Sequence, residues 1–259
     1  MLWKYISLVF LVVGSILAIV FRLSLPGYAS LALGTLALIG ANRQFAKHIG
    51  LVFISVSIIA AAPIDTRIDF MHMVVMGSMI STAVLLPYLV TRYVYKEDVI
   101  RFPFYKHTWT RGHIGYILLT VFLSYILLPF WMNSTKGYLN WTVINDPWHL
   151  FVLFLGTNGL GIWDELFFIV TTLALLKRHL PFLQANIVQA ILFTSFLYEL
   201  GFRGWAPWLI FPFALLQGEV FRRTDNLLYI IAIHLSIDFV LYLALINAHI
   251  PTLFDIFIT

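Results

Sequence analysis

The sequence contains no cysteine and very few charged residues. The absence of cysteine excludes disulfides, thiolate nucleophiles and cysteine-ligated metal sites. Only 11% of the 259 residues are charged and 61% are hydrophobic, whereas an ordinary soluble domain has roughly 25% charged residues. Lipid cannot satisfy free backbone polar groups, so a chain that lies in a bilayer must be mostly helical. The composition therefore predicts an all-α, polytopic transmembrane helical bundle of about 8–9 helices.

The surplus of basic residues gives the chain a formal net charge of +4. These residues are spread over the loops and form no basic stripe, so we expect no nucleic-acid partner. The partners predicted instead are the lipid bilayer and a membrane protein or peptide.

Nine apolar segments lie between polar clusters, and each is a candidate membrane span. The third and the eighth are short, which fits an interfacial or re-entrant helix as well as a span. The segments are 3–21, 25–41, 49–64, 70–94, 113–132, 148–176, 186–202, 207–221 and 226–248.

The distribution of Lys and Arg predicts an orientation, because cytoplasmic loops accumulate basic residues. A cytoplasmic N-terminus leaves only Arg22, Arg67, Lys136 and Arg203 outside. The other 12 of the 16 basic residues are then cytoplasmic: Lys4, Arg43, Lys47, Arg92, Lys96, Arg101, Lys106, Arg111, Lys177, Arg178, Arg222 and Arg223. We therefore expect a multi-pass protein of a bacterial or archaeal cell membrane, with nine crossings and its N-terminus inside.

Ionisable side chains inside apolar segments are costly and often mark functional sites. Four of the 12 acidic residues, Asp164, Glu165, Glu199 and Asp238, lie well inside predicted helices. Counted from the cytoplasmic end of each helix, they lie at a depth of about 18–20 Å, and His234 at about 12 Å. His234 and Asp238 share one helix face because four residues separate them. Asp164 and Glu165 point about 100° apart, so they cannot both point at the same spot, and we expect only one of them to be catalytic.

Three helix-borne patterns in the last hundred residues resemble the CPBP family of intramembrane endopeptidases, the CAAX protease and bacteriocin-processing or Abi family. For the motif Glu-Glu-x-x-x-Arg, residues 164–169 keep the acidic pair and lack the arginine. For Phe-x-x-x-His, residues 192–200 offer Glu199 at the histidine position. His234 and Asp238 satisfy the motif His-x-x-x-Asn or Asp. The resemblance implies N-terminal transmembrane helices without a recognised motif over residues 1–145 and a catalytic helical core over residues 146–250.

The resemblance also implies an activity and roles for these residues. The activity is hydrolysis of a peptide bond in a membrane-associated protein or peptide by water activated on buried carboxylates. Asp164 or Glu165 would be the base, Glu199 its partner, and His234 the donor to the oxyanion. Asp238 would orient His234, or would donate to the oxyanion if burial keeps it protonated.

Other interpretations of the same residues stay open. No cofactor is expected, yet Glu165, Glu199, His234 and Asp238 would also suit a divalent, zinc-like metal. Glu199 precedes Arg203 by four residues, which is the favourable order for a simple helix ion pair. The missing motif-one arginine and motif-two histidine favour a catalytically inactive family member, acting as a membrane immunity, binding or transport protein.

Overall fold

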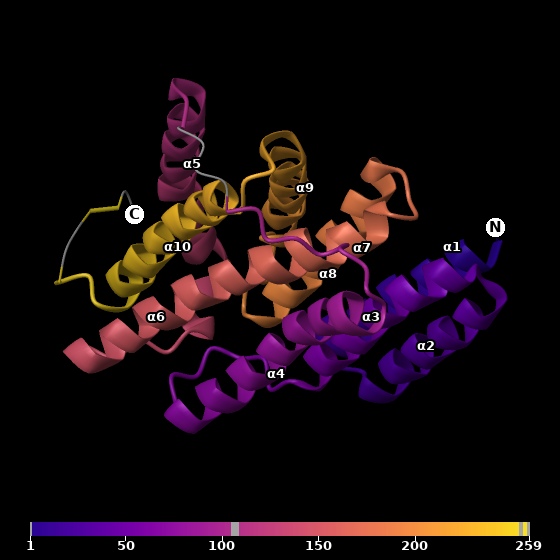
Figure 1. Cartoon of the computed structure of the whole chain (residues 1–259). Coiled ribbons are helices and arrows are strands. Elements are labelled where there is room, and N and C mark those ends of the chain that lie inside the picture. The colour runs from indigo at the N-terminus through magenta and orange to yellow at the C-terminus, as the bar shows by residue number, and fades with distance from the viewer. Residues whose placement is uncertain (1, 105–108, 254–255, 258–259) are drawn as a thin grey trace.

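The computed structural model describes residues 2–104, 109–253 and 256–257, and no strand occurs among them (Figure 1). Continuous helical runs make up nine rods in this part of the chain, in agreement with the predicted all-α fold and its 8–9 helices. The short 3₁₀ turn η4 (Gly137–Asn140) lies outside the rods. The rods are α1 (Leu2–Ser15) with η1 (Ile16–Val20), α2 (Ser24–Ala37) with η2 (Leu38–Gly40), α3 (Arg43–Ala61), α4 (Phe70–Leu89) with η3 (Val90–Val94), α5 (Arg111–Thr135), α6 (Pro147–Asp164) with η5 (Glu165–Thr172) and α7 (Leu173–Lys177), α8 (Phe182–Glu199), α9 (Pro207–Thr224) and α10 (Leu227–His249).

Six of the rods are long and apolar enough to cross a membrane, which supports the predicted multi-pass membrane protein. They are Leu2–Val20, Arg43–Ala61, Phe70–Val94, Arg111–Thr135, Pro147–Lys177 and Leu227–His249. The apolar rod Ser24–Gly40 is shorter. The count of nine crossings stays a prediction, as does the division of the chain at residue 145.

The third segment is longer than its sequence pattern predicted. The helix α3 begins at Arg43, because the side chain of Asn42 caps it by accepting from the backbone N–H of Gln44 at 2.9 Å. The polar His48, directly before the predicted start of this segment, is buried inside the helix. The expectation of a short third helix is therefore wrong, and α3 has the length of a span.

The rod formed by α6, η5 and α7 runs through the middle of the molecule (Figure 1). It contacts α3 and α4 on one side and α8, α9 and α10 on the other. Trp163 ties it to α4, since its indole N–H donates to the carbonyl of Ile80 at 2.8 Å. Seven of the eight residues of η5 are buried. The acidic pair at the start of η5 therefore lies at the centre of the bundle.

Helix ends that the distribution of Lys and Arg places on the same side of the membrane contact one another in the structure. At one end, the ammonium of Lys47 lies 4.8 Å from the ring centroid of Tyr95, and the guanidinium of Arg222 lies 4.9 Å from that of Phe182. At the other end, the hydroxyl of Thr66 donates to the carbonyl of Asn140 at 2.5 Å. Predicted inner ends thus contact inner ends, and outer ends contact outer ends. Which end faces the cytoplasm stays a prediction. Lys106, one of the basic residues predicted to be cytoplasmic, lies outside the described residues.

The buried His48 and the partly buried His179 join α3 to the end of the central rod. His48 Nδ1 and His179 Nε2 lie 2.8 Å apart, and His48 Nε2 lies 2.8 Å from the carboxylate of Glu97. Lys4 adds α1 to this junction by donating to the carbonyl of His179. Partial burial, and secondarily the nearby His48 and Lys4, lowers the pKa of His179 from 6.5 to about 4.

This junction predicts that the fold loses stability in mild acid. The unfolded chain binds a proton at His179 below pH 6.5, whereas the folded chain binds it only near pH 4. The free energy of unfolding should therefore fall as the pH is lowered from 6.5 to 4, by about 1 kcal/mol after allowance for solvent screening of this partly exposed side chain. Unfolding of the purified protein in detergent micelles across this range measures the loss. The variant His179→Gln should flatten the slope, and an unchanged slope would contradict the role of His179.

The predicted orientation can be tested on introduced cysteines, because the natural chain has none. Arg178 and Asn145 are exposed at opposite ends of the central rod. In intact cells, a membrane-impermeant maleimide should label Asn145→Cys and leave Arg178→Cys unlabelled until the membrane is opened. The reverse pattern would invert the topology, and labelling of both positions in intact cells would show that the central rod does not cross.

Candidate active site

The acidic pair lies where the central rod changes from an α-helix to a π-helix. Asp164 ends α6, and Glu165 begins η5. The wider i→i+5 turn of a π-helix rotates the chain by less per residue than the about 100° of an α-helix. Glu165 approaches Nδ1 of His234 and Asp164 approaches Nε2, so the two carboxylates reach opposite nitrogens of one imidazole. That only one of the two acids is catalytic stays a prediction.

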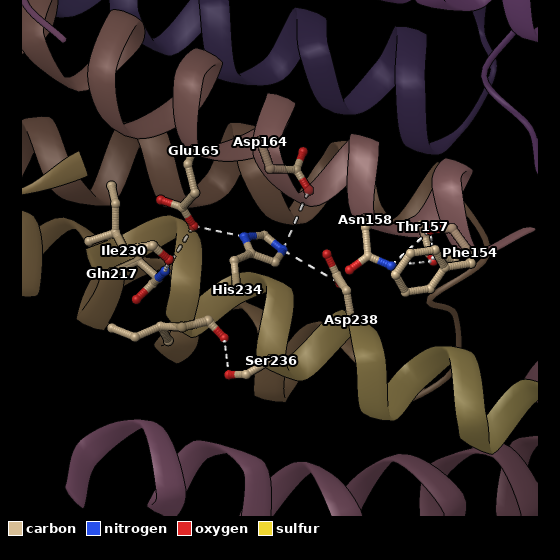
Figure 2. A network of polar contacts seen from close by, with 11 residues as sticks. Phe154, Thr157, Asn158, Asp164, Glu165, Gln217, Ile230, His234, Ser236 and Asp238 are labelled. Carbon is tan, nitrogen blue, oxygen red and sulfur yellow. Dashed lines mark hydrogen bonds and ion pairs between the residues drawn. The ribbon is translucent and has the colours of Figure 1, made fainter. Parts of the chain in front are cut away.

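His234 stands between three carboxylates, all buried (Figure 2). Its Nδ1 lies 2.7 Å from Oε1 of Glu165. Its Nε2 lies 3.8 Å from Oδ2 of Asp164 and 3.8 Å from Oδ1 of Asp238, both longer than a hydrogen bond. Figure 2 shows Glu165 on one side of the imidazole and the two aspartates on the other. Glu165 is thus bound to the ring, while the aspartates flank its free nitrogen.

The amide of Gln217, on α9, is a member of this site that the sequence reasoning missed. Its Nε2 donates to Oε1 of Glu165 at 2.8 Å and to the carbonyl of Ile230 at 3.3 Å. Gln217 is fully buried. Only ionisable residues were considered in the apolar segments, and an amide carries no charge. The signal available in the sequence was a glutamine within an otherwise apolar run, directly before Gly218.

The aspartates face a cavity of about 640 Å³ that is lined mostly by apolar residues. Asp164, His234 and Asp238 contribute to its wall, whereas Glu165 does not. One face of α5, from Tyr116 to Trp131, lines its length. One oxygen each of Asp164 and Asp238 has no hydrogen-bond partner among the described residues. The cavity therefore brings a bound molecule up to two carboxylates and one imidazole nitrogen.

Aromatic rings enclose the imidazole. The ring of Phe213 meets that of His234 edge-on with centroids 5.6 Å apart, and Phe193 lies at 6.0 Å. Phe193 comes from α8, the helix on which the second family motif places its histidine. The side chain of α8 that contacts His234 in the described structure is therefore aromatic, and it carries no acidic or basic group.

Glu199 is not brought to this site. It lies six residues beyond Phe193 on α8, which is about 9 Å farther along the helix, and its carboxylate pairs with Arg22. The predicted pair with Arg203 is wrong, because α8 ends at Glu199 and the chain turns at Gly201 with φ 100°. Arg203 consequently does not occupy the next helical turn.

The donor set does not fit the metal alternative. Among residues 2–104, 109–253 and 256–257, no group of three or more histidine, aspartate or glutamate side chains is arranged to hold a metal ion. Of the four ligands considered, Glu199 lies apart, and Glu165 and Asp238 contact opposite nitrogens of His234. We therefore derive no step that uses a metal.

Residues 146–240 match the family model described as "Type II CAAX prenyl endopeptidase Rce1-like". The match confirms the CPBP assignment. No curated protein and no solved structure matches the chain. The CPBP segment contains the central rod, α8, α9 and the start of α10, and thus every side chain that surrounds His234. The match of this segment to a protease family supports a hydrolase at the level of its class.

The closest packing in the site predicts a glycine requirement. A Cβ added at Gly161 would lie 1.9 Å from Oδ2 of Asp238, whereas one added at Gly159 would meet nothing within 4 Å. Gly161→Ala should therefore destabilise the protein by about 1–3 kcal/mol through overpacking. Gly159→Ala, the matched control on the same helix, should be neutral or stabilising by up to about 1 kcal/mol. Unfolding in mixed micelles measures both, and equal effects would contradict the close contact of Asp238 with α6.

Proposed function

We propose that this chain is an intramembrane peptidase that hydrolyses a peptide bond in a membrane-associated protein or peptide. The supporting observation is that Glu165 binds one nitrogen of His234 while the other nitrogen stands beside two carboxylates in the wall of an apolar cavity. Hydrolysis requires a base for water and a preorganised donor for the oxyanion. These groups occur together here, and the cavity suits an apolar peptide segment.

Asp164 is the base in this proposal. It lines the cavity, whereas Glu165 is occupied by His234 and Gln217. The carboxylate of Asp164 takes a proton from water, and the resulting hydroxide adds to the carbonyl carbon of the substrate. Asp164 then returns the proton to the departing nitrogen as the C–N bond breaks.

His234 stabilises the oxyanion in this proposal. With a proton on each nitrogen, it donates to Glu165 through Nδ1 and to the oxyanion through Nε2. Asp238 contacts the Nε2 side and an ionised carboxylate can only accept, so it orients the Nε2 proton. This assignment decides between the roles that the sequence left open for Asp164, Glu165 and Asp238.

One observation favours the second candidate, a catalytically inactive family member that binds a membrane partner or ligand. Phe193 contacts His234 from the helix that carries the motif-two histidine in the family. An aromatic ring cannot share the activation of water. In this alternative the cavity binds its ligand and no bond is broken.

Single substitutions separate the two candidates. Asp164→Asn should lower peptide cleavage by about 10²–10⁴-fold, as loss of a general base does. His234→Gln should lower it by about 10²–10³-fold, as loss of an oxyanion donor does. New N-termini in the membrane proteins of expressing cells, identified by mass spectrometry, provide the measurement.

The carboxylate control for this experiment is Asp98→Asn. Asp98 is exposed in a loop, where it pairs with Arg92 and Arg101. Cleavage should survive this change. If the wild-type chain and folded Asp164→Asn yield the same N-termini, the peptidase proposal fails and the binding alternative replaces it.

A further inference from the structure

The environment of Gln217 determines which way its amide points. Its two described hydrogen-bond neighbours, the carboxylate of Glu165 and the carbonyl of Ile230, are both acceptors. The amide must therefore present its NH₂ group to them, since its carbonyl oxygen cannot donate. Gln217 thus supplies a fixed donor to Oε1 of Glu165.

Two other buried amides hold the helix that carries Gln217. Asn186 Nδ2 donates to the carbonyl of Leu215 at 2.9 Å, and Gln189 Nε2 donates to the carbonyl of Ala214 at 3.0 Å. The approach is close, because a Cβ added at Gly218 would lie 2.0 Å from Oδ1 of Asn186. The bond from Asn186 to Leu215, two residues before Gln217, therefore holds Gln217 against α8, which packs on the central rod.

The donor from Gln217 has a consequence for His234. Oε1 of Glu165 also lies 2.7 Å from Nδ1 of His234. An oxygen that already accepts from an amide and is held in place acts as an acceptor toward the imidazole as well. In the neutral ring the proton therefore lies on Nδ1, and Nε2 takes up the second proton, with which it donates to the oxyanion.

We propose that Gln217 is a positioning residue: it holds Glu165 as the acceptor of the Nδ1 proton of His234, so that Nε2 is the nitrogen that serves the reaction. The catalytic meaning of this inference rests on the proposed peptidase function. Which nitrogen of neutral His234 carries the proton does not depend on any substrate.

The test is the protonation of His234 measured by nitrogen NMR. The full chain is labelled with ¹⁵N-histidine and reconstituted in lipid nanodiscs, and the signals lost in His234→Asn identify this ring. A pH series then gives the nitrogen that carries the proton in the neutral ring. We expect Nδ1–H in the wild type and a mixture of both tautomers in Gln217→Met.

Gln189→Met is the matched control. Gln189 and Gln217 are both fully buried amides that donate to a backbone carbonyl, but only Gln217 contacts Glu165. The control should keep Nδ1–H, as the wild type does, because Asn186 still donates to the carbonyl of Leu215 and holds α9 in place. A general loosening of the bundle would disturb both variants equally, and that result would overturn the proposal.

The wild type alone can also overturn it. If neutral wild-type His234 carries its proton on Nε2, Gln217 does not impose the proposed arrangement, whether or not Gln217→Met folds. The proposal is equally wrong if folded Gln217→Met keeps the wild-type tautomer.

Cleavage assays then separate this inference from the proposed function. Where the wild type cleaves, Gln217→Met should lower kcat by up to about 100-fold and change KM little, as misplacement of a reacting group does. A wild type that cleaves nothing but shows the expected tautomers would overturn the peptidase proposal and leave the positioning of His234 intact.

Discussion

The hydrogen bond between Glu165 and His234 joins two helices that are far apart in the sequence, and both of its side chains are buried. A carboxylate at such a position is costly unless several donors satisfy it. Here an imidazole nitrogen and an amide meet one oxygen, from α10 and α9 respectively. The need to satisfy this carboxylate therefore specifies how α9 and α10 sit against the central rod.

The π-helical turn after Asp164 makes the arrangement possible. An uninterrupted α-helix would direct two adjacent carboxylates about 100° apart, and they would reach different neighbours. π-Helical turns are rare and often occur at functional sites, because they redirect side chains at the expense of regular hydrogen bonding. In this chain the turn is enclosed by aromatic packing, with Trp163 and Phe167 stacked at 5.2 Å and both rings buried. The rigid surroundings hold both carboxylates on one imidazole.

The sequence predicted the helical membrane bundle and the partnership of His234 with Asp164, Glu165 and Asp238, because apolar length and buried charge are local properties. It failed where the geometry depends on tertiary packing. The depth count placed Glu199 at the level of the other acids, but a residue count from one helix end does not specify how that helix is shifted along its neighbours, and Phe193, not Glu199, lies at the level of His234. Gln217 was missed because its importance comes only from its contact with Glu165. The π-turn had no recognisable signal in a run of aromatic and branched residues.

In this chain, which departs from the family motifs, the polar groups that could react lie on one side of His234. Phe193 and Phe213 cover the ring, and Glu165 occupies Nδ1, so the Nε2 side is where polar groups line the cavity. Asp164 and Asp238 both stand there, and like charges near one site favour sharing of a proton. A base and a proton donor can thus arise from three side chains without the family's motif-two histidine. Activity therefore requires water to enter an apolar cavity beside Asp164 and Asp238, the carboxylates in its wall.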